Sequence, residues 1–190
     1  MTLPPLRLKP RCERRLKLGH LWVYSNEVDV DQTPLRNFSP GEQVRVIDAR
    51  GQVLGIAMVN PFTLICARLV SRDPERPLNR PLLSHRLRRA LSLREAWFDQ
   101  PYYRLVYGDS DLLPGLVVDR FGDYLVVQIA TAGMEREKEE VIAALQDAFR
   151  PRGILLRNDH GARAMEGLSP EVRVVGEVPD RVELVAVSYT

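Results

Sequence analysis

Residues 43–70 read QVRVIDARGQVLGIAMVNPFTLICARLV. Val44 and Val46 alternate with polar side chains, Gly51-Gln52 occupies a hairpin position, and Asn60-Pro61 separates the last two apolar runs. Short runs rich in β-branched residues and divided by turn residues are typical of a small barrel or meander. The predicted strands are residues 43–49, 53–59 and 63–70. We therefore expect residues 1–72 to form a compact, all-β module.

A cationic and aromatic segment precedes these runs. Residues 7–17 hold six Lys or Arg side chains and one acid, Glu13, and residues 19–28 read GHLWVYSNEV. Phosphate backbones attract cations, and single-stranded bases stack on flat side chains. The segment therefore predicts an RNA-binding surface, formed by Arg14, Arg15, Lys17, His20 and Trp22. The alternative is a strand whose aromatic side chains fill a core and whose charges are merely solvated.

The net charge of +2 conceals a polarity along the chain. Residues 1–95 carry seventeen Lys or Arg and nine Asp or Glu, a net charge of +8, whereas residues 96–190 carry ten and sixteen, a net charge of −6. This asymmetry favours contact between the first half and a polyanion such as RNA. An Arg-rich composition also fits a GC-rich genome or a hot growth temperature.

Several classes of protein lack their usual signals. No apolar run is long enough to cross a bilayer, and the polar, Pro-rich start does not resemble a signal peptide, so we expect a cytoplasmic protein without a membrane partner. Two cysteines, Cys12 and Cys66, are too few for a disulfide framework. The three histidines lack zinc-ligand spacing, and neither a nucleophile elbow nor a glycine-rich phosphate or dinucleotide loop is present.

Residues 73–81 are predicted to be a linker, because prolines and alternating charges cluster there. A helix is predicted over residues 82–98, with Leu83, Leu87 and Ala90 on its apolar face. Arg94 falls inside that apolar sector. It either extends its charged end to solvent or pairs with a buried acid, and it is a weak functional candidate.

The remainder predicts an α+β module over residues 82–190, of the strand-strand-helix-strand-strand type. Val141, Leu145 and Phe149 repeat at helical spacing, acids crowd the first turn, and Pro151 ends the pattern, so a helix is expected over residues 134–150. Strand-like runs lie on both sides of this helix. They are residues 102–107, 116–119, 124–130, 153–157, 172–176 and 182–187.

An acidic segment begins at Gly108 and reads GDSDLLPGLVVDRFGDYLVVQ. Its carboxylates could collect a divalent cation, which would indicate a metal-dependent nuclease. Asp and Ser are also ordinary turn residues, and Pro114-Gly115 fits the centre of a type II turn. The turn interpretation is the stronger, and we predict no metal site. The acids concerned are Asp109, Asp111, Asp119 and Asp123.

Two long motifs resemble the bacterial large-subunit ribosomal RNA (cytosine-C5) methyltransferases of the RlmI type: GHLWVYSNEV and GDSDLLPGLVVDRFGDYLVVQ. The resemblance includes the short links Pro40-Gly-Glu, Val59-Asn-Pro and Met165-Glu-Gly-Leu168. The resemblance extends from about Leu6 to Leu184. It implies an N-terminal PUA domain, which is a small RNA-binding barrel, followed by a central α+β domain. It also implies a C-terminal Rossmann-like domain that binds S-adenosylmethionine and carries catalytic cysteines.

The chain departs from that family in its last residues. Cys12 and Cys66 lie in the PUA-like part and do not match the catalytic positions, and VAVSYT (residues 185–190) does not continue the family pattern. Such enzymes attack the pyrimidine ring with a cysteine thiolate. We therefore expect no catalytic residue, and no cofactor in this chain, although the family uses S-adenosylmethionine.

The leading hypothesis is an RNA-binding, substrate-presenting part of an rRNA methyltransferase-like protein, truncated and inactive on its own. Its expected partner is RNA, in particular ribosomal RNA, together with a separate catalytic domain or a second copy in a homodimer. A stand-alone RNA-binding or ribosome-associated adapter is the alternative. The metal-dependent nuclease is a third and weaker possibility.

Overall fold

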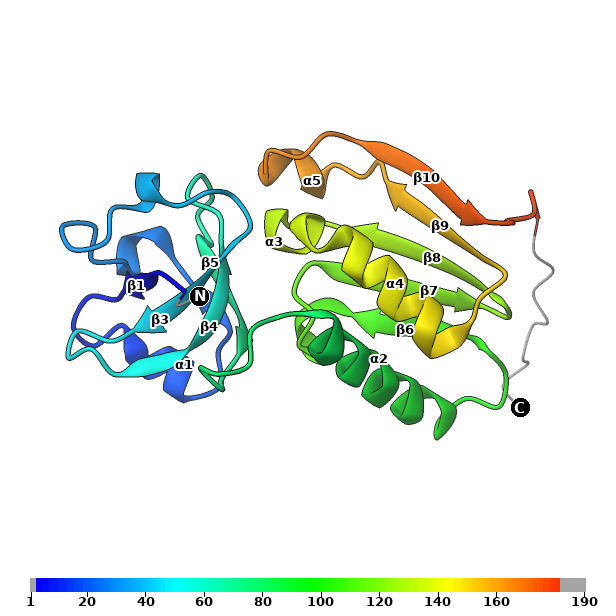
Figure 1. Cartoon of the computed structure of the whole chain (residues 1–190), viewed down its shortest axis with the longest axis horizontal. Coiled ribbons are helices and arrows are strands. Elements are labelled where there is room, and N and C mark those ends of the chain that lie inside the picture. Colours follow the sequence, from blue (N-terminus) through cyan, green and yellow to red (C-terminus); the bar gives the residue numbers. More distant parts are fainter. Residues whose placement is uncertain (1–2, 182–190) are drawn as a thin grey trace, which may run out of the picture.

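The computed structural model describes residues 3–181, which form two five-stranded sheets, each with its own helices. Figure 1 shows the first module, residues 3–72, at one end of the molecule and the second, residues 80–181, at the other. The expected fold class, a PUA-like small barrel followed by an α+β domain, is confirmed. No helix of the described residues is long and apolar enough to cross a membrane.

The first sheet is curled into a half-barrel with the order β1-β3-β4-β5-β2. Its strands are β1 (Pro5–Arg7), β2 (Trp22–Val23), β3 (Glu42–Ile47), β4 (Val53–Val59) and β5 (Ala67–Ser71). Val44 and Val46 point into a closed core, as their alternation predicted, and Gly51 makes the β3–β4 turn at φ +85°. β1 runs parallel to β3, and the β3–β4–β5 pairings are antiparallel.

Two local predictions for this module need correction, and the alternative of a strand at residues 19–28 holds only in part. Residues 63–66 form a loop and not the start of a strand, because Thr63 Oγ1 donates to the carbonyl oxygens of Asn60 and Ile65. The segment at residues 19–28 contributes only the two residues of β2 to the sheet. A short helix, α1 (Glu13–Lys17), interrupts the expected all-β module.

The second sheet has the order β10-β9-β8-β7-β6. Its strands are β6 (Tyr102–Tyr107), β7 (Leu116–Phe121), β8 (Tyr124–Ile129), β9 (Gly153–Asn158) and β10 (Glu171–Gly176). Only β8 and β9 are parallel, since the chain crosses between them through α3 (Ala132–Arg136) and α4 (Lys138–Phe149). Three strands thus precede the main helix. The strand expected at residues 182–187 lies outside the described residues.

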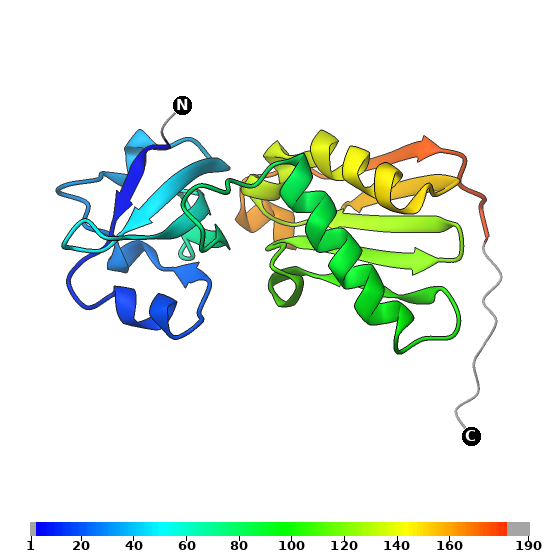
Figure 2. The same ribbon diagram turned by 60° about the horizontal axis from the view of Figure 1, so that its bottom comes forward.

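The helices α2 (Arg80–Glu95) and α4 pack against each other on one face of this sheet (Figure 2). Leu83, Leu87 and Ala90 of α2 are buried there, as predicted. The Asn79 side chain caps α2 by accepting from the backbone N–H of Leu82 at 3.1 Å. The helix expected over residues 134–150 is divided at Glu137, and Arg150 ends α4 in the left-handed conformation.

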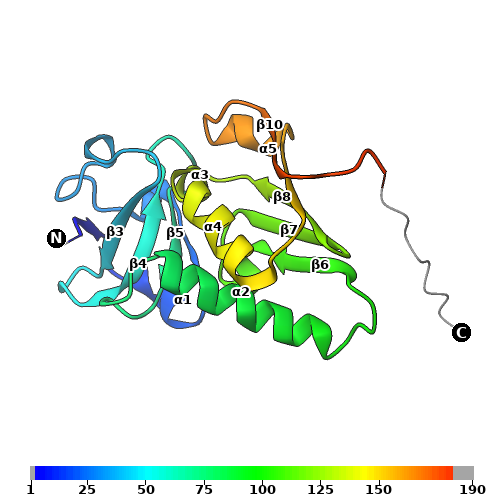
Figure 3. The same cartoon turned by 45° about the vertical axis from the view of Figure 1, so that its right-hand side comes forward.

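The two modules share part of one core. Ile56, Met58 and Val70 of the first module are buried in the same cluster as the apolar residues of the second sheet and its helices. The end of the second module that holds α3 lies beside the first sheet (Figure 3). There Gly133 leaves room for Met58, because a Cβ at position 133 would lie 2.5 Å from the Met58 Cβ.

A buried carboxylate joins the modules across this junction. Glu166 follows the short helix α5 (Ala162–Met165) and is 8% exposed. Its carboxylate accepts from Asn60 Nδ2 at 2.8 Å and from the backbone N–H of Ala132 at 3.2 Å, and it pairs with Arg68 Nη1 at 2.8 Å. Both partner side chains, Asn60 and Arg68, belong to the first module.

We predict that Glu166→Ala lowers the free energy of unfolding by about 3–5 kcal/mol, because it leaves a largely buried guanidinium and other donors without an acceptor. Urea unfolding followed by circular dichroism measures the loss. The control is Glu139→Ala, which removes the exposed partner of Arg173 and should change stability little. Equal losses in the two variants would contradict a special role for the Glu166 junction.

Candidate nucleic-acid interface

The helix α1 carries three of the cations that the sequence assigned to RNA binding. Leu16 is 2% exposed and anchors the helix in the core of the first module. Glu13 lies in the first turn, where an acid is favourable to the helix dipole. Anchored by Leu16, the helix leaves Arg14 and Lys17 exposed. α1 is thus a small platform that presents positive charge to solvent.

The predicted cations of α1 differ in their partners. Arg15 Nη1 lies 3.2 Å from Glu27 Oε1, and its guanidinium stacks 4.9 Å from the ring centre of Tyr24. Lys17 Nζ lies 3.6 Å from Asp48 Oδ2. Arg14 has neither an ion-pair nor a side-chain hydrogen-bond partner within residues 3–181. Arg14 is therefore the cation of this helix most available to a ligand.

A hollow of about 370 Å³ lies beside α1. Four cationic side chains and two acids contribute to its walls, so positive charge predominates. The acids, Glu13 and Asp48, do not neutralise all of it. The residues that line the hollow are Pro10, Arg11, Glu13, Arg14, Lys17, Asp48, Ala49, Arg50 and Gln52.

His20 and Trp22 connect this surface to the rest of the molecule. The His20 side chain is exposed, and its carbonyl oxygen accepts from Arg72 Nη2 at 3.2 Å. Trp22 is 37% exposed, and its Nε1–H donates to Asp109 Oδ2 at 3.2 Å. The indole therefore has one edge held by the second module, while part of its ring remains open for stacking. Sequence reasoning missed this contact between its two main motifs.

The acids of the second motif are each held separately. The Asp111 carboxylate accepts hydrogen bonds from both terminal nitrogens of Arg94, at 2.8 and 2.7 Å, and from the backbone N–H of Tyr107. The buried-acid interpretation of Arg94 is therefore the correct one. Asp119 pairs with Arg104, and Asp123 lies 3.5 Å from Arg152. Within residues 3–181 no three His, Cys, Asp or Glu side chains are grouped so that they could hold a metal ion.

The turn interpretation of this motif is confirmed at Pro114-Gly115. Gly115 has φ +82°, and the Leu116 N–H donates to the Leu113 carbonyl oxygen at 3.0 Å across the turn. A side chain at position 115 would also collide with Thr131, whose Oγ1 lies 2.3 Å from an ideal Cβ. The acidic motif thus forms the β6–β7 connection, β7 and most of β8, and it holds Trp22 through Asp109.

Neither cysteine has the properties of an activated nucleophile. Burial raises the pKa of the Cys66 thiol to about 12. Burial, with the negative charge of Glu27 beside it, also raises the pKa of Cys12. Because the thiolate is the reactive form, both thiols are poor nucleophiles near neutral pH. Both are free cysteines.

Comparison with known proteins gives a family for the first module and relatives for the whole chain. The PUA-like domain family matches residues 6–72. A ribosomal RNA large subunit methyltransferase I from Klebsiella pneumoniae subsp. pneumoniae is 34% identical over 181 residues, covering 93% of this chain and 44% of the relative. The protein of the same description from Escherichia coli O139:H28 is 34% identical, covering 88% of this chain and 42% of the relative.

Solved structures share the fold. A SAM-dependent methyltransferase structure from Streptococcus mutans matches with a TM-score of 0.73 at 18% identity, covering 94% of this chain and 45% of that one. A second methyltransferase structure, solved with SAH, matches with a TM-score of 0.70 at 19% identity, covering 82% of this chain and 40% of that one.

The chain spans less than half the length of each of these proteins. At 34% identity over 93% of its residues, and with a PUA-like domain at residues 6–72, the chain is related to the RlmI-type ribosomal RNA large subunit methyltransferases, the family that its two long motifs predicted.

Proposed function

We propose that this chain binds ribosomal RNA and presents it for cytosine-C5 methylation, acting in the cytoplasm as the RNA-recognition part of an RlmI-type methyltransferase system. The methyl donor, S-adenosylmethionine, and the catalytic cysteine are supplied by a separate catalytic domain. The relatives are ribosomal RNA large subunit methyltransferases, which supports the choice of substrate and reaction. The PUA-like match supports RNA as the ligand.

The observation that carries the proposal is the surface of α1. It combines the cation-rich hollow beside the helix with the exposed Arg14, which has no ion pair or side-chain hydrogen bond within residues 3–181. Trp22, five residues after the end of the helix, leaves part of its ring open. Cations for phosphates next to a flat ring for a base are what a single-stranded RNA requires. Arg15, Lys17 and His20 complete the proposed contact set, with Arg15 and Lys17 exchanging their present carboxylate partners for phosphates.

We assign residues 1–72 to the RNA-binding domain, residues 73–81 to the linker and residues 82–190 to a central domain. Several acids of the central domain pair with arginines of the same domain, among them Asp111 with Arg94 and Asp119 with Arg104. This pairing leaves them unsuited to metal chemistry and fits a scaffold that holds the RNA-binding domain in place. The Trp22–Asp109 contact is part of that scaffold.

Arg14→Ala should weaken the binding of single-stranded RNA and reduce the slope of log affinity against log salt by about 0.7, the value for one lost phosphate contact. Fluorescence anisotropy across a salt series measures both quantities. The matched control is Arg36→Ala. Arg36 lies on the 3-10 turn Leu35–Asn37. Figure 1 draws this turn in light blue at the top of the first module and α1 at the bottom. A slope equal to that of the wild type would remove Arg14 from the interface.

The 190-residue chain alone should bind no S-adenosylmethionine and transfer no methyl group to RNA. The turn from β8 into α3 does contain a glycine, but the Ala132 N–H there already donates to Glu166, and Gly133 packs against Met58. Titration calorimetry with the cofactor and transfer of a tritiated methyl group to rRNA are the measurements. Saturable micromolar binding of the cofactor to this chain would contradict the proposal that a separate catalytic domain binds it.

A further inference from the structure

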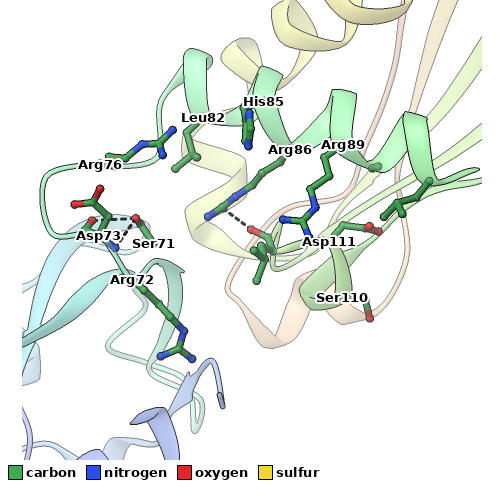
Figure 4. Close-up of a pocket in the computed structure, with 13 residues that line it drawn as sticks. Ser71, Arg72, Asp73, Arg76, Leu82, His85, Arg86, Arg89, Ser110 and Asp111 are labelled. Atoms are coloured by element: carbon green, nitrogen blue, oxygen red, sulfur yellow. Dashed lines mark hydrogen bonds between the residues drawn. The ribbon is translucent and has the colours of Figure 1, made fainter. Parts of the chain in front are cut away.

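A second cation-rich cavity lies between the two modules. Its volume is about 450 Å³, and its walls come from the end of the first module, from the linker, from α2 and from the loop before β7. We call it the junction cleft. Figure 4 shows residues 71–76 on one side and His85, Arg86 and Arg89 of α2 on the other. The residues that line it are Ser71, Arg72, Asp73, Arg76, Leu82, His85, Arg86, Arg89, Ala90, Leu93, Ser110, Asp111 and Leu112.

Positive charge in the junction cleft is in excess of its acids. Four arginines line it, against the carboxylates of Asp73 and Asp111. Asp111 is already engaged by the fork of Arg94, which approaches from outside the cleft lining. Asp73 has no ion pair within residues 3–181, and its Oδ1 accepts from the backbone N–H of Glu75. At most one acid therefore opposes the four guanidinium groups.

The four arginines are arranged as two fixed and two available cations. Arg72 donates to the carbonyl oxygens of Leu16 and His20, and Arg86 donates to those of Val70 and Leu112. Carbonyl partners hold a guanidinium in place without neutralising its charge. Arg76 and Arg89 have no side-chain hydrogen bond or ion pair within residues 3–181.

Arg86 is half-buried in the cleft, where its neighbours include other arginines. Loss of solvent on burial, with the nearby charge of Arg76, lowers the pKa of Arg86 to about 10. An anion placed between these side chains would relieve that repulsion. Arginine forks suit phosphate oxygens in particular, because the planar guanidinium can donate two parallel hydrogen bonds to them.

The junction cleft also continues the surface of α1. Arg72 bonds directly to Leu16 in α1 and to His20 next to Trp22, so it forms the border between the two regions. The cleft has apolar side chains as well, from Leu82, Ala90 and Leu93, against which a base or sugar could pack. A single-stranded RNA that lies on α1 would therefore reach a second group of cations without leaving the protein surface.

We propose that the junction cleft binds one nucleotide of the same single-stranded RNA that contacts α1, with Arg76 and Arg89 holding its backbone phosphate. This inference rests on the proposed function. It adds α2 and the linker to an interface that was assigned to the first module alone. Arg72 and Arg86 fix the shape and the positive electrostatic potential of the cleft. Arg76 and Arg89 bind the phosphate.

The test compares the double variant Arg76→Ala/Arg89→Ala with Arg88→Ala in anisotropy titrations with a labelled 20-nucleotide single-stranded RNA. Arg88 is an exposed arginine next to Arg89 in α2 that does not line the cleft. The double variant should bind about tenfold more weakly, since hydrogen bonds to charged groups are lost. Its salt slope should fall by about 0.7, and Arg88→Ala should behave as the wild type.

The outcomes separate this inference from the function beneath it. Wild-type affinity in the double variant, with Arg14→Ala weakened as expected, overturns the cleft and leaves the proposed function standing. If the wild-type chain binds no RNA, both fail. Uridine monophosphate is titrated in parallel. If the double variant loses binding of this nucleotide but still binds RNA like the wild type, the cleft is a site for small anions and the RNA assignment is overturned. Should the double variant melt early, Arg89→Gln replaces it in the same comparisons.

Discussion

The close contact between the first sheet and α3 is the constraint on which the remaining architecture depends. Gly133 admits Met58, and Gly41, at φ +80°, faces the Ala132 carbonyl oxygen so closely that an ideal Cβ would lie 2.5 Å from it. Glu166 then ties Asn60 and Arg68 to the start of α3. Backbones that approach this closely leave little freedom to slide, because interiors are packed like crystals. The two sheets therefore act as one framework, and surfaces that span the junction keep a defined shape.

Several strands were predictable because their signals are local. Val44 and Val46 alternate with polar side chains, and Gly51 and Gly115 stand where a turn requires positive φ. Helix α1 gave no such signal, since five residues are too few for an apolar repeat and only Leu16 is buried. The sequence also gave no signal that the helix predicted over residues 134–150 is divided at Glu137 into α3 and α4. The division arises because α3 stops to pack against the first sheet, which is a tertiary effect.

The interface was predictable in composition and not in detail. Sequence alone located the cations of residues 7–17 but could not show that Arg15 is engaged by Glu27 while Arg14 is not. The pairing of Arg94 with Asp111 and of Trp22 with Asp109 requires knowing that distant loops meet. The junction cleft was missed for the same reason. Its arginines come from the end of the first module, from the linker and from α2, and they gather only when the two modules are packed together.

The missing side chain at position 133 also bears on how this protein changes in evolution. A Cβ at position 133 would lie 2.5 Å from the Met58 Cβ, an atom that every residue except glycine carries, so shortening the side chain at position 58 would not make room for it. The two positions lie in different modules, 75 residues apart in the chain. Relatives that keep this close junction should therefore keep glycine at position 133 while the side chain at position 58 varies. A second module exchanged between relatives would fit this first module only if it brought that glycine with it.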